Sequence, residues 1–99
     1  MMMTGARGRL RTFEDYVRFV DKLAERPSGR EILEGTTDEY ATWEIFEGDV
    51  VTCIEEMGFS YVLFGNLVQL GYEGVERDSE RNLLHTAIAK MAKRSPYYG

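Results

Sequence analysis

The fold depends on residues 41–70, which read ATWEIFEGDVVTCIEEMGFSYVLFGNLVQL. Apolar side chains recur in this stretch at helical spacing; they are Trp43, Phe46, Val50, Val51, Ile54 and Met57. The stretch is also rich in aromatic and β-branched residues, which favour strands, and Gly65-Asn66 could form a hairpin turn. We predict an all-α fold, a small bundle of four to five short helices. The alternative is an α+β fold with a helix, a β-meander and a second helix.

A glycine divides the first half of this stretch. Gly48 is a poor interior helix residue, less favourable than alanine by about 1 kcal/mol. We therefore predict two short helices, over residues 38–47 and 50–57, with Asp49 as the N-cap of the second helix.

Two further glycines are expected to end helices. Gly58 suits the left-handed position after a helix, with Phe59 reaching back to Ile54 as in a Schellman motif. Ser60 can cap the next helix, which we expect to end at Gly71-Tyr72.

An amphipathic helix is predicted on the N-terminal side. Thr12 is a suitable N-cap for a helix over residues 13–25, and Pro27 prevents it from continuing. A single helical turn over residues 28–33, capped by its first residue, is expected to end before Gly35.

A second amphipathic helix is predicted near the C-terminus, between an N-cap at Asp78 or Ser79 and a stop at Pro96. Its buried face is expected to comprise Leu83, Leu84, Ala87, Ile88, Met91 and Ala92. The pattern places His85 on the polar flank of this helix, exposed to solvent.

The composition is that of one small globular protein. The chain has 99 residues, of which 43% are hydrophobic, and this is enough for a single core. We predict a flexible basic segment over residues 1–11 and one globular domain over residues 12–99. The start Met1-Met2-Met3 leaves the initiation site open. No stretch suggests a membrane span, and the only cysteine, Cys53, fits a reducing compartment, so we predict a cytoplasmic protein.

The charge distribution indicates the kind of partner. The net charge is −5, but residues 1–12 are basic, residues 13–57 carry thirteen acids against four basic residues, and residues 79–99 are again basic. An acidic middle repels phosphate, so we do not expect direct nucleic-acid binding and favour a protein partner with a basic surface. The candidate partner-binding residues are Glu44, Glu47, Asp49, Glu55 and Glu56.

Catalytic, metal and cofactor sites are not indicated. Cysteine catalysis would need Cys53 beside His85, and the acids next to Cys53 would raise the pKa of its thiol. The chain lacks a cluster of His and Cys, a calcium-binding loop and a phosphate-binding glycine motif. A helix-turn-helix over residues 50–67 is rejected, because its second helix has no Lys or Arg to contact DNA. We expect no enzyme activity, no cofactor and no metal.

One tripeptide resembles a known family. Met57-Gly58-Phe59 is similar to the Met-Gly-Phe loop of ubiquitin-associated domains, in which Met57 and Phe59 would contact ubiquitin. The resemblance covers less than half of the chain and ends where the third helix of that family needs apolar residues, since Asp78 and Ser79 stand there. A helix ending with a hydrophobic plug explains the same tripeptide, and we favour that explanation.

The functional hypothesis is a non-enzymatic acidic protein that inhibits a protein partner by covering its basic or nucleic-acid-binding surface. Bacterial immunity proteins and phage anti-defence proteins, such as anti-CRISPR proteins, are analogues in size and charge. The alternatives are a homo-oligomeric structural or regulatory protein, including a homodimer, and a small nucleic-acid-associated regulator that uses its basic termini.

Overall fold

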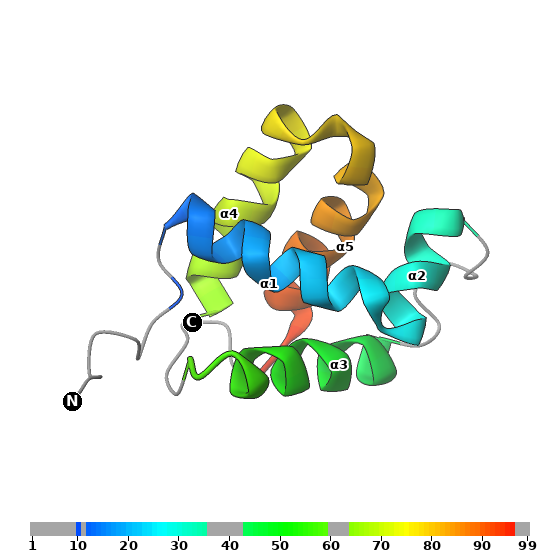
Figure 1. Ribbon diagram of the computed structural model, residues 1–99, viewed down its shortest axis with the longest axis vertical. Helices are drawn as coiled ribbons and strands as arrows, with labels where there is room; N and C mark the ends of the chain where they lie inside the picture. The colour runs from blue at the N-terminus through cyan, green and yellow to red at the C-terminus, as the bar shows by residue number, and fades with distance from the viewer. Residues whose placement is uncertain (1–9, 11, 36–42, 60–63, 97–99) are drawn as a thin grey trace.

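The computed structural model describes residue 10 and residues 12–35, 43–59 and 64–96. Within these ranges the chain forms helices and no strand, which confirms the all-α prediction over the β-meander (Figure 1). The helices are α1 (Phe13–Glu25), α2 (Pro27–Glu34), α3 (Trp43–Glu56), α4 (Phe64–Arg77), the short 3-10 helix η2 (Ser79–Arg81) and α5 (Asn82–Arg94). Most of the predicted basic segment, residues 1–11, lies outside the described residues; Leu10 is buried.

Helix α1 has the predicted bounds because its ends are set by local interactions. The Thr12 side chain accepts a hydrogen bond of 3.1 Å from the Asp15 N–H. Arg26 leaves helical geometry before Pro27, and its N–H bonds the Leu23 carbonyl.

Helix α2 is longer than the predicted turn and begins differently. Pro27 occupies its first position, where a missing N–H is harmless, so Ser28 is not the N-cap. The Ser28 hydroxyl instead donates to an Asp49 carboxylate oxygen at 2.5 Å, which ties the start of α2 to α3. The helix ends at Gly35, whose φ of 70° is left-handed.

Helix α3 corrects the prediction of two helices, because it continues through Gly48. Uninterrupted helix places Phe46, Val50, Cys53 and Ile54 in the core together. This burial outweighs the unfavourable helix propensity of one glycine, about 1 kcal/mol. Asp49 is consequently a mid-helix residue and not an N-cap; residues 38–42 of the predicted first helix lie outside the described part of the chain.

The end of α3 has the predicted Schellman geometry. Gly58 has a φ of 82°, its N–H bonds the Glu55 carbonyl, and the Phe59 N–H bonds the Ile54 carbonyl, both at 3.0 Å. The Phe59 side chain is buried in the core, so it is not presented to a partner as the resemblance to ubiquitin-associated domains would require. The predicted Ser60 cap lies outside the described residues.

Helices α4 and α5 form an antiparallel pair, with the reversal at η2 (Figure 1). Helix α4 does not end at Gly71 as predicted but continues to Arg77. Gly71 is needed for close packing: a Cβ there would lie 2.9 Å from the His85 carbonyl oxygen and 3.0 Å from Ala89 Cβ. A Cβ at Gly74 would lie 2.5 Å from His85 Nδ1. Both glycines therefore allow α5 to approach α4.

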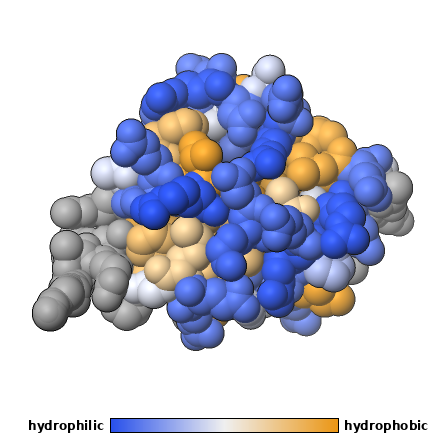
Figure 2. Space-filling view, in the orientation of Figure 1, coloured by the Kyte–Doolittle hydropathy of each residue, from blue (hydrophilic) through white to orange (hydrophobic). Residues whose placement is uncertain are grey.

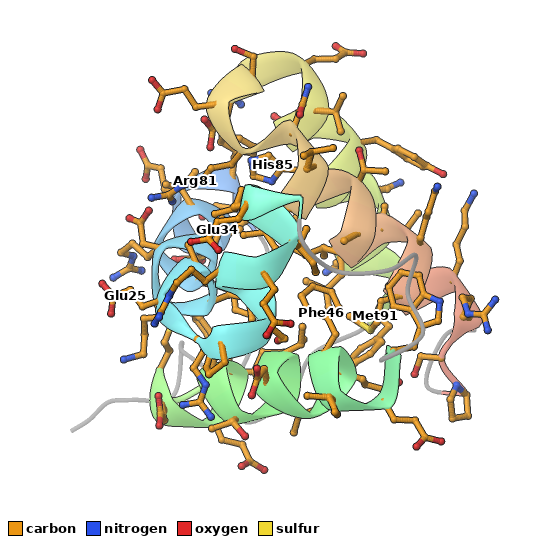
Figure 3. All side chains as sticks on the ribbon, turned by 90° about the vertical axis from the view of Figure 1, so that its right-hand side faces the viewer. Glu25, Glu34, Phe46, Arg81, His85 and Met91 are labelled. Carbon is orange, nitrogen blue, oxygen red and sulfur yellow. The ribbon has the colours of Figure 1, made fainter. Side chains whose placement is uncertain are left out.

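The core receives side chains from all five α-helices. Phe46 points from α3 toward Met91 of α5 (Figure 3). One prediction about burial is wrong: Leu83, which was expected on the buried face of the last helix, is exposed. The view in Figure 2 shows mostly hydrophilic side chains with separate hydrophobic patches between them. Among the described residues, no helix has the length and apolar character needed to cross a bilayer.

Candidate functional site

Helix α3 lies at one edge of the molecule and turns one side away from the other helices (Figure 3). We define the outer face of α3 by four of its exposed residues, Glu44, Ile45, Gly48 and Glu55. Ile45 is 62% exposed. Neither Glu44 nor Glu55 forms an ion pair with another described residue.

A shallow cavity of about 460 Å³ adjoins this outer face, and we name it the α3 groove. Its lining residues are Glu44, Glu47, Gly48, Val51 and Pro96. Glu47 is held there because the Ser95 hydroxyl donates to one of its carboxylate oxygens at 3.3 Å. The groove thus combines two carboxylates with an apolar wall and a stretch of helix backbone that carries no side chain.

The other two predicted binding residues have internal partners. Asp49 Oδ1 lies 3.4 Å from Arg26 Nη2, and its second oxygen accepts from Ser28. Glu56 lies 3.6 Å from Lys22 Nζ and 3.7 Å from Arg26 Nη1. These contacts join α3 to the end of α1 and the start of α2, so Asp49 and Glu56 hold the helices together.

The five predicted residues therefore lie in three different surroundings. Glu44 and Glu47 meet at the α3 groove, Glu55 lies on the outer face, and Asp49 and Glu56 belong to the internal network. Sequence reasoning missed that Pro96 would line the groove. No periodic signal could have found it, because Pro96 follows α5 and reaches α3 only through the tertiary fold.

A buried hydrogen-bond chain corrects the prediction that His85 is exposed. His85 has no exposed surface; its Nδ1 lies 2.7 Å from the Tyr16 hydroxyl and its Nε2 lies 3.0 Å from Asp78 Oδ2. An ionised carboxylate only accepts, so Nε2 donates to Asp78, and in the neutral ring Nδ1 accepts from the Tyr16 O–H. The chain joins α1 to α5 and to the end of α4.

The Tyr16–His85–Asp78 hydrogen-bond chain has the residue types of a proton relay, but Tyr16 and His85 are not accessible to a substrate or to solvent. Tyr16 is fully buried, and burial raises the pKa of its hydroxyl, with a smaller effect of the Asp78 charge in the same direction. Both ring nitrogens of His85 are occupied, so neither is free to activate Cys53. Tyr16 and His85 thus satisfy each other in the core, which is the usual requirement for buried polar groups.

Cys53 lies in the core. Its side chain is fully buried, and burial raises the pKa of the thiol. A protonated, enclosed thiol is a poor nucleophile. In the described part of the chain, no group of three or more His, Cys, Asp and Glu side chains is arranged to hold a metal ion.

The chain matches no protein family model, no curated protein and no solved structure. The outer face of α3, together with its groove, is the candidate site.

Proposed function

We propose that this is a non-enzymatic binding protein whose outer α3 face docks on a basic surface of a partner protein and covers it. The observation that carries the proposal is the contrast among the acids of α3. Asp49 and Glu56 are neutralised by Arg26 and Lys22, whereas Glu44 and Glu55 extend from the outer face without a described ion pair.

An exposed apolar residue supports the same face. Ile45 is 62% exposed beside Glu44, and an apolar contact surrounded by charge is typical of protein interfaces. Carboxylates on such a face would attract a basic partner and orient it, and they would occupy a site that otherwise binds phosphate. By analogy in size and charge with immunity proteins and anti-CRISPR proteins, we propose that the protein inhibits its partner by occlusion.

The test compares capture of a partner by charge-reversed variants. The double variant Glu44→Lys/Glu55→Lys reverses the outer face, and Glu25→Lys/Glu76→Lys makes the same change in net charge at exposed positions elsewhere. The partner should be retained by the native chain and by the control pair, and lost by the α3 pair. Its retention should also weaken at about 0.5 M salt, where exposed charges are screened.

Two results contradict this proposal. Equal capture by both double variants would show that the outer face is not the docking surface. Recovery of the bait alone, together with a dimer in light scattering that dissociates with salt, would show self-association instead of inhibition of a partner.

A further inference from the structure

The α3 groove contains a glycine that the fold itself does not require. Gly48 lies inside α3, and it is not among the glycines with positive φ. A Cβ built on Gly48 would meet no atom within 4 Å, in contrast to Gly71 and Gly74. Alanine would favour the helix by about 1 kcal/mol. The packing of the described residues therefore gives no reason for glycine, whereas a ligand lying against the helix backbone would.

The chemistry of the groove selects a long basic side chain. Val51 and Pro96 provide apolar surface, and Glu44 and Glu47 are three residues apart, which makes them neighbours on the helix surface. Lys and Arg side chains lay their methylene groups on apolar surface while the charged end remains among polar groups. Arginine suits two carboxylates better than lysine, because its planar guanidinium has five donors.

We infer that the α3 groove is the binding site for an arginine side chain of the partner protein. Its guanidinium is bound by Glu44 and Glu47, and its methylene groups pack on Val51 and Pro96. Gly48 leaves the space through which the side chain reaches the helix. This inference rests on the proposed function, which concerns the whole outer face, and it adds the chemical group that the face recognises.

A hexa-arginine peptide is the probe, with hexa-citrulline as its uncharged counterpart. Isothermal titration should show binding of the first peptide and not of the second. Amide NMR shifts on titration should be largest at Gly48 and Val51. Binding of both peptides alike, no binding of either, or shifts concentrated on another element would overturn the assignment.

Substitutions then test the groove itself. Gly48→Leu fills the groove and keeps both carboxylates, and Glu47→Gln removes one charge while it still accepts from Ser95. Each should weaken hexa-arginine binding by at least about tenfold, Glu47→Gln because one charge-assisted hydrogen bond is lost, and Gly48→Leu because its side chain excludes the arginine from the groove. Gly65→Leu is the matched control, because a Cβ there also meets nothing within 4 Å. It should change the affinity by no more than about twofold.

The outcomes separate this inference from the proposed function. If Gly48→Leu binds hexa-arginine like the native chain while Glu44→Lys/Glu55→Lys still loses the partner, the groove assignment is wrong and the acidic face remains. If the double variant also retains the partner, the proposed function fails. Circular dichroism of Gly48→Leu should show unchanged helix, since a Cβ at this position meets no atom within 4 Å.

Discussion

The buried chain from Tyr16 through His85 to Asp78 gives a quantitative test of how the helices are joined. Tyr16→Phe removes only the hydroxyl that lies 2.7 Å from His85 Nδ1. The ring still fills its site, so there is little change in apolar packing. The loss is one buried hydrogen bond, and His85 keeps an acceptor that no water can reach, because both side chains are fully buried.

The expected decrease in unfolding free energy is about 1–3 kcal/mol, the range for leaving a buried polar group unsatisfied. For a domain of this size, each kcal/mol lowers Tm by roughly 4–8 °C. Urea unfolding, followed by circular dichroism, should show a lower midpoint with an unchanged m value, because the exposed surface of the unfolded chain is the same.

The control for this experiment is Tyr72→Phe. Tyr72 is 51% exposed, and its ring, which remains in the variant, is the part that Lys93 contacts. Its effect should stay within about 0.5 kcal/mol, as for other surface substitutions. If Tyr16→Phe is as mild as Tyr72→Phe, the Tyr16 hydroxyl is not a necessary partner of His85, and our account of this chain is refuted.

Three further predictions follow from burial and close packing. Cys53 should react with a thiol reagent such as DTNB only after unfolding, and rapid reaction of the native chain would contradict its burial. The pKa of Tyr16 is raised above its ordinary 10.0 in the folded state, so its stabilising contribution is complete below about pH 10 and is lost as the pH rises further. The free energy of unfolding should therefore fall more steeply above about pH 10 in the native chain than in Tyr16→Phe, which lacks this titrating hydroxyl. Gly29→Ala should destabilise by more than about 1 kcal/mol in urea unfolding, because its Cβ would lie 2.1 Å from the Leu23 carbonyl oxygen; Gly65→Ala, which meets open space, should not.

Among the features that the sequence determined by itself are the bounds of α1 and the Schellman ending of α3. These helix ends are defined by Thr12, Pro27 and Gly58, each of which acts within a few positions of the end in question. Their effects can therefore be predicted from the sequence. The burial of Phe46, Val50 and Ile54 also follows from helical periodicity.

Only the tertiary structure decided how glycines inside helices are used. Gly48 and Gly71 have the same low helix propensity, and both were predicted to end helices. Helix continues through both because burying the apolar side chains on either side is worth more than about 1 kcal/mol. At Gly71 the close approach of α5 adds a second reason, which no local pattern contains.

The candidate site shows the same division. The charge distribution pointed to five acids in the middle of the chain as binding residues, but their roles depend on neighbours from distant segments. Arg26 and Ser28 engage Asp49, whereas Pro96 completes the groove beside Glu47. His85 was predicted to be exposed because the spacing of α5 shows nothing of Tyr16, which lies 69 positions away and meets it in the core. Charge and periodicity are properties of the chain, but burial and pairing depend on which segments meet, and the tertiary structure alone decides that.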